Sequence, residues 1–192
     1  GWVCVLLRRE TKMSTATPEP AAKPQLETQT TVGNYFVSNY PPFSFWQPDA
    51  VPEVMEAMER APDEGTPLGL YIHIPFCRKR CHFCYFRVYT GVNSSEVNTN
   101  LDALIHELEL YAQKPFTQNR KLDFVYFGGG TPSFLSAKQL HSLADRMKAL
   151  MPWDQAREVA FECEPGTLTE SKLQAIREIG VTRLSLGIEN FD

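Results

Sequence analysis

From residue 68 onward, short apolar runs alternate with stretches of helical periodicity. The apolar runs have the length of strands and occupy residues 68–74, 122–127, 159–163 and 182–186. Between them, residues 96–112 place apolar side chains on one helical face, and Ser136 and Thr169 are suited to cap two further helices. This order predicts an α/β fold with four parallel strands and right-handed crossovers, in an open sheet or a barrel.

Each predicted strand is followed by an unusual loop. The first strand is nearly continuously apolar, which predicts burial on both faces. In parallel α/β folds, ligands gather at the carboxyl ends of the strands. The loops at those ends are residues 77–84, 128–132, 162–165 and 187–190. Because four such loops meet on one rim, we expect the functional site there.

The first of these loops holds three of the chain's five cysteines. Cys77, Cys81 and Cys84 follow the spacing C-x3-C-x2-C. This crowding differs from a secreted disulfide framework and indicates metal binding in a reducing compartment, which suggests the cytoplasm.

Three thiolates leave one position of a four-ligand metal site without a cysteine. A zinc site completed by His82 or a remote histidine is one alternative, and three buried structural cysteines are another. The basic residues 78–80 argue against a buried loop and are expected to form a solvated loop face. An iron–sulfur cluster with one open iron, where a small ligand binds, is the preferred interpretation.

The composition bounds the remaining functions. Hydrophobic residues make up 43% of the 192 residues, enough for a core, and the formal net charge is −4. No basic stripe indicates nucleic acid. The apolar run at residues 2–7 is far shorter than the roughly 20 residues of a membrane span.

The segment before the predicted strands divides in two. Residues 1–31 are rich in Ser, Thr, Ala and Pro and are expected to be a disordered lead-in, with Met13 as a possible true start. Residues 32–67 are expected to be an aromatic arm and linker, with a short helix whose first turn holds Pro52. Residues 68–192 then form the folded core.

The cysteine spacing after a first strand, with Phe83 before the last cysteine, resembles the radical SAM superfamily. Three strings are more specific: residues 71–77 (YIHIPFC), 128–132 (GGGTP) and 183–187 (RLSLG). They are similar to oxygen-independent coproporphyrinogen III oxidase and its relatives, which include heme chaperones. The resemblance implies a partial (β/α)6 barrel. A barrel of this kind has six βα units, so the chain looks like a truncated N-terminal part of the core.

The resemblance also implies the cofactors. Cys77, Cys81 and Cys84 match the ligands of a [4Fe–4S] cluster, and S-adenosylmethionine binds the open iron in that family. An electron from the reduced cluster cleaves it to methionine and a 5′-deoxyadenosyl radical. An external donor such as a flavodoxin or ferredoxin is the implied partner.

Six positions match cofactor contacts of the family, and a seventh cofactor position carries a different residue. Gly129 corresponds to the loop at the amino end of the methionine moiety, and Glu162 to an acid at the ribose hydroxyls. Gly130 and Thr131 match contacts to a second S-adenosylmethionine. At Glu189 the chain departs from the glutamine that relatives commonly carry. The full set is Tyr71, Phe83, Gly129, Gly130, Thr131, Glu162 and Glu189.

The implied activity is oxidative decarboxylation of coproporphyrinogen III, without oxygen, in porphyrin and heme biosynthesis. Two alternatives stay open. One is a heme chaperone that keeps the cluster and transfers heme. The other is a radical SAM methyltransferase or ring-opening enzyme acting on another tetrapyrrole. No residue is assigned a catalytic role.

Overall fold

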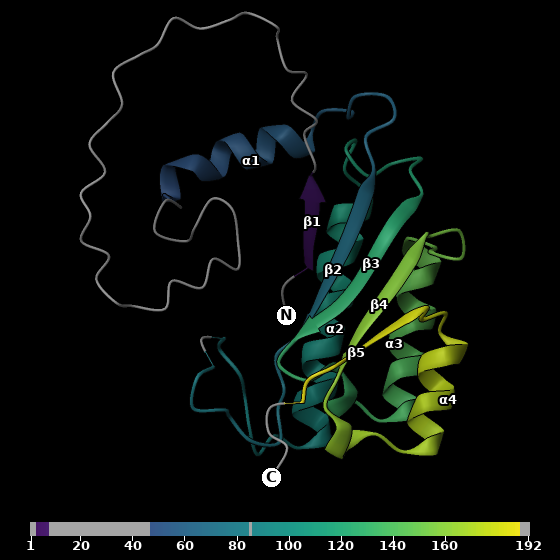
Figure 1. Ribbon diagram of the computed structural model, residues 1–192. Helices are drawn as coiled ribbons and strands as arrows, with labels where there is room; N and C mark the ends of the chain where they lie inside the picture. The colour runs from purple at the N-terminus through teal and green to yellow at the C-terminus, as the bar shows by residue number, and fades with distance from the viewer. Residues whose placement is uncertain (1–2, 8–46, 85, 189–192) are drawn as a thin grey trace, which may run out of the picture. The chain divides into compact units, whose positions relative to one another are not determined.

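The computed structural model describes residues 3–7, 47–84 and 86–188 (Figure 1). The chain divides into two units, residues 9–57 and residues 1–8 with 58–192. The described part of the first contains a 3-10 helix, Pro48–Ala50, followed by α1, Val51–Met58. Pro52 is the second residue of α1, where its missing N–H costs no helical hydrogen bond, as expected.

The second unit contains a five-stranded sheet in the order β1-β2-β3-β4-β5. Strands β2 to β5 are parallel, so the four predicted strands and the α/β class are confirmed. Their order along the sheet is also their order in the sequence (Figure 1). The strands are β1 Val3–Leu7, β2 Leu68–Ile74, β3 Leu122–Gly129, β4 Glu158–Cys163 and β5 Arg183–Leu186.

Strand β1 corrects part of the predicted lead-in over residues 1–31. Residues Val3–Leu7 are a strand that pairs antiparallel with β2, with Val3 opposite Ile72 and Leu7 opposite Leu68. The run is apolar and contains two valines, which favour extended backbone, and β2 offers it unpaired edge groups. The rest of the predicted lead-in lies outside the described residues.

Three helices cover one face of the sheet (Figure 1). They are α2 Ser94–Ala112, α3 Ala137–Leu150 and α4 Glu170–Glu178. Ser136 and Thr169 cap α3 and α4 as expected, and Gly180, with φ +97°, follows the end of α4. Helix α2 begins at a capping box of Asn93 and Glu96 that the sequence analysis missed. Among the described residues, no helix is both long and apolar enough to cross a membrane.

The alternating burial of β2 corrects a second expectation. Leu70, Ile72 and Ile74 are fully buried, whereas Tyr71 and His73 are only half-buried. Within the described part of this unit, helices lie on one face of the sheet, so side chains on the other face stay partly accessible. The strand is therefore not buried on both faces, and its open face carries polar side chains toward the predicted site.

Candidate functional site

The cysteine loop, residues 77–84, follows closely on the end of β2 at Ile74. The Cys77 N–H donates to the Tyr89 carbonyl at 3.1 Å, and the Tyr89 N–H donates to the Pro75 carbonyl at 2.8 Å. These two bonds close the base of the loop against the end of the strand. Cys77 is buried, Cys84 is partly exposed and Cys81 is exposed. The loop therefore has one anchored thiol and two accessible ones.

The anchored thiol lies in a low-polarity environment. Burial raises the pKa of the Cys77 thiol, and a hydrogen bond from the Thr131 hydroxyl opposes that rise. The Thr131 Oγ1 lies 3.3 Å from the Cys77 Sγ. Burial thus disfavours the thiolate form of the metal-free side chain, which becomes a metal ligand only by losing its proton.

The basic residues of the loop lie on its exposed side, as predicted. Arg78 donates to the Gly166 carbonyl at 2.9 Å, which ties the cysteine loop to the loop after β4. Arg80 donates to the Cys84 carbonyl at 3.1 Å, and the Cys84 N–H donates to the Cys81 carbonyl at 3.2 Å. These bonds shape the part of the loop that holds the two accessible thiols.

Within the described part of the chain, no group of three or more Cys, His, Asp or Glu is arranged to hold a metal ion. The three cysteines share one loop without converging on a common point. The donor set itself, three thiols on a backbone-anchored loop, suits a soft metal centre. His82 is exposed. The assignment of the three thiols as ligands remains a prediction.

The glycine loop, residues 128–132, begins in the last two residues of β3 and packs directly on the cysteine loop. The Gly130 N–H donates to the Ile74 carbonyl at 2.8 Å. A Cβ added at Gly130 would lie 2.9 Å from the Phe76 carbonyl oxygen and 3.0 Å from the Cys77 Sγ. At Gly129, with φ +110°, a Cβ would lie 2.7 Å from the His73 ring. Both positions therefore require glycine, because backbone approaches the cysteine and histidine this closely.

Glu162 joins the glycine loop to the open face of the sheet. Its Oε1 accepts from the Tyr126 hydroxyl at 2.6 Å, and its Oε2 accepts from the Gly129 N–H at 3.2 Å. Burial and this carboxylate raise the pKa of Tyr126 to about 12. The Tyr71 ring stacks on that of Tyr126 at 5.8 Å, and the Tyr71 hydroxyl lies 3.2 Å from the His73 Nδ1.

Five of the seven predicted cofactor residues thus fall into two groups. Tyr71, Gly129 and Glu162 are linked through Tyr126, while Gly130 and Thr131 adjoin Cys77. Phe83 is 62% exposed. Glu189 lies outside the described residues.

A buried polar network, missed by the sequence analysis, connects two of the rim loops. The Ser133 Oγ accepts from the Glu164 N–H at 3.0 Å and lies 2.5 Å from the Thr167 Oγ1. The Lys172 ammonium donates to the Ser133 carbonyl at 2.7 Å. Ser133 and Thr167 each follow a loop proline by one or two residues, a signal too common to have identified them. The network fixes the glycine loop against the loop after β4.

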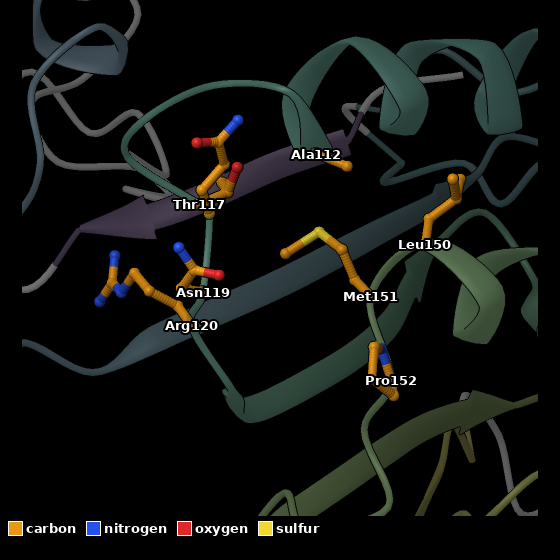
Figure 2. A pocket seen from close by; sticks show the side chains of 8 residues that line it. Ala112, Thr117, Asn119, Arg120, Leu150, Met151 and Pro152 are labelled. Carbon is orange, nitrogen blue, oxygen red and sulfur yellow. The ribbon is translucent and has the colours of Figure 1, made fainter.

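A cavity of about 200 Å³ lies elsewhere, beside the loops that precede β3 and β4 (Figure 2). Parallel strands put these loops at the end of the sheet opposite the cysteine loop. Arg120 at the cavity already donates to the Phe116 carbonyl at 3.1 Å and to the Thr66 carbonyl. The lining residues are Ala112, Thr117, Gln118, Asn119, Arg120, Leu150, Met151 and Pro152. The cavity is therefore separate from the predicted site.

Comparison with known proteins identifies a matching family model and several similar proteins. A family model described as the Radical SAM superfamily matches residues 71–192. An oxygen-independent coproporphyrinogen III oxidase of Cereibacter sphaeroides is 36% identical over 129 residues, which cover 67% of this chain and 28% of that protein. The heme chaperone HemW of Bacillus subtilis is 40% identical over 123 residues, which cover 64% and 32%.

The fold has a counterpart among solved structures. Coproporphyrinogen III oxidase (HemN) from Escherichia coli, described as a radical SAM enzyme, matches with a TM-score of 0.58 and 31% identity. The match covers 64% of this chain and 28% of that one. The four parallel strands thus correspond to part of a radical SAM barrel. The chain spans about a third or less of the length of the relatives it matches.

Proposed function

Because the chain belongs to the radical SAM superfamily, we propose that Cys77, Cys81 and Cys84 hold a [4Fe–4S] cluster and that S-adenosylmethionine binds at its open iron. The observation that carries this proposal is the contact between the cysteine loop and the glycine loop, at the end of β2 and β3. When bound, the cluster supplies the electron that cleaves S-adenosylmethionine. The accessible thiols of Cys81 and Cys84 suit a reducing compartment, and we propose the cytoplasm.

The chain's own residues would hold the nucleoside and amino acid ends of that ligand. The Glu162 carboxylate, fixed by the Tyr126 hydroxyl and the Gly129 N–H, accepts hydrogen bonds from ribose hydroxyls. The carbonyl groups of the glycine loop accept from the ligand's ammonium group. We propose Tyr71 and Phe83 as flanking aromatic contacts. Gly130 and Thr131 are the proposed contacts to a second molecule, and Glu189 is a further proposed cofactor contact.

The proposed reaction is the oxygen-independent oxidative decarboxylation of coproporphyrinogen III. A propionate side chain would lose a hydrogen atom, carbon dioxide and one electron, which an external acceptor would take, and would become a vinyl group. The oxidase of C. sphaeroides and the solved HemN structure support it. An external one-electron donor, a flavodoxin or ferredoxin, would reduce the cluster. The protein would place the substrate's propionate side chain beside the ligand and exclude water.

A second candidate function is heme chaperoning. It is favoured by the HemW relative of B. subtilis, whose 40% identity exceeds the 36% of the C. sphaeroides oxidase. Both functions would use the cysteine loop and the glycine loop. They differ in whether the bound tetrapyrrole is a substrate or a cargo.

The two functions are separated by one anaerobic experiment on the full-length protein. It is reconstituted with iron and sulfide. One portion is then incubated with S-adenosylmethionine, a reductant and coproporphyrinogen III, and a second portion is titrated with heme. We expect vinyl products that do not form when S-adenosylmethionine is omitted. Stoichiometric heme binding without turnover would instead establish the chaperone, and S-adenosylmethionine cleavage with neither outcome would indicate another tetrapyrrole reaction. A protein that holds no cluster would overturn the proposal.

A further inference from the structure

The hydrogen bond from Thr131 to Cys77 joins two buried side chains from different loops. Thr131 is 8% exposed and Cys77 is 9% exposed, and their Oγ1 and Sγ atoms are 3.3 Å apart. Burial matters because water, the usual competitor for a sulfur acceptor, has little access to this pair. The hydrogen bond from the Thr131 hydroxyl to the Cys77 sulfur is therefore protected from exchange with water in the folded protein.

Both partners are held in place by their backbones. The Phe134 N–H donates to the Thr131 carbonyl at 2.8 Å, which starts the 3-10 helix Pro132–Phe134. The neighbouring Gly130 N–H is bonded to the Ile74 carbonyl, and the Cys77 N–H to the Tyr89 carbonyl. These bonds hold the two backbones at the ends of β2 and β3. The χ1 angles of Thr131 and Cys77 are then what remains to set the distance between the hydroxyl and the sulfur.

A hydroxyl that donates to a cluster thiolate has a known physical effect. Hydrogen bonds to the sulfurs are among the factors that set the reduction potential of an iron–sulfur cluster. Reduction adds one negative charge to the cluster, and a donor stabilises the more negative form more strongly. The bond from Thr131 should therefore raise the potential and make reduction easier.

We propose that Thr131 is a positioning residue whose hydroxyl holds the Cys77 sulfur and raises the reduction potential of the cluster. The inference rests on the proposed function, because it requires that Cys77 be a cluster ligand. It assigns the hydroxyl a role that is independent of any second S-adenosylmethionine. The step affected is the one-electron reduction of the cluster by its external donor.

The test measures the midpoint potential of the reconstituted full-length protein by anaerobic redox titration without S-adenosylmethionine. Thr131→Val removes the hydroxyl and keeps the shape, while Thr131→Ala removes it without adding a group that could clash. Thr131→Ser keeps the hydroxyl. Thr117→Val is the matched control, because Thr117 is also buried and its hydroxyl donates to backbone carbonyls near the other end of the sheet.

We expect the Val and Ala variants at Thr131 to retain iron and sulfide and to have a lower midpoint potential. A tenfold loss in the equilibrium constant for reduction would appear as 59 mV for one electron. The Ser variant and Thr117→Val should match the wild type. Unchanged potentials in the Val and Ala variants would overturn this inference and leave the proposed function intact. A wild-type protein without a cluster would overturn the proposed function and this inference with it.

Discussion

Gly129 and Gly65 both have positive φ, yet only one of them is enclosed. At Gly129, φ is +110° and an added Cβ would lie 2.7 Å from the His73 ring. At Gly65, φ is +79° and no atom lies within 4 Å of that position. Substitution at either glycine would therefore strain the backbone. Only at Gly129 would the new side chain also collide with a neighbouring residue.

This pair gives a prediction for the ligand site. Gly129→Val should keep the cluster but weaken S-adenosylmethionine binding at least tenfold, about 1.4 kcal/mol, because the side chain displaces His73 and distorts the loop that bonds to Glu162. Anaerobic equilibrium dialysis with labelled ligand measures the affinity, and iron analysis measures the cluster. Gly65→Val is the control and should leave the affinity unchanged. Equal affinities in wild type and Gly129→Val would argue against the role of the glycine loop.

At the level of single elements, β5 is the most exposed of the strands whose side chains are described, β2 to β5. Leu184 pairs in register with Phe161, and Leu186 with Cys163. Phe161 and Cys163 are buried on the helical side of the sheet, whereas Leu184 is 42% exposed and Leu186 is 52% exposed. Among the described residues, β5 pairs with β4 and with no other strand. The strand therefore presents apolar side chains and open backbone groups together.

An edge of this kind promotes association between chains. We expect the isolated 192-residue chain to self-associate at micromolar concentration, as measured by sedimentation velocity. Replacing both leucines by lysine, Leu184→Lys with Leu186→Lys, should raise the monomer fraction, because charge on an edge strand opposes pairing. The matched double change on the exposed face of α2, Ala103→Lys with Leu110→Lys, adds the same two positive charges and serves as the control. A monomeric wild-type chain would contradict this expectation.

The helices, the strands and most helix caps could be predicted from the sequence, whereas the burial of the two faces of a strand could not. The caps at Ser136 and Thr169 were visible in the sequence because a capping side chain acts within three residues of itself. Asn93 acts in the same local way and was overlooked, so that miss was avoidable. The burial of β2 was not predictable locally, because an apolar run does not say whether helices cover one face of the sheet or both.

At the scale of the molecule, topology explains why the site could be anticipated in outline. Parallel strands bring their carboxyl ends to one edge of the sheet. Loops that are distant in sequence therefore lie together there because of the topology, whatever motifs they contain. Contacts such as Arg78 to Gly166, and Thr131 to Cys77, depend on the distances between those loops. No spacing in the sequence encodes such distances, so these bonds emerged only from the structure.

The central claim is that the three loop cysteines hold a cluster that cleaves S-adenosylmethionine. Cys81→Ala and Cys163→Ala test it most directly, because both remove one thiol but Cys163 is buried at the end of β4, outside the loop. After anaerobic reconstitution of the full-length protein, iron, sulfide and the formation of 5′-deoxyadenosine are measured together. We expect about four irons per chain and cleavage in the wild type and Cys163→Ala, and loss of both in Cys81→Ala. Cluster and cleavage retained in Cys81→Ala would contradict it.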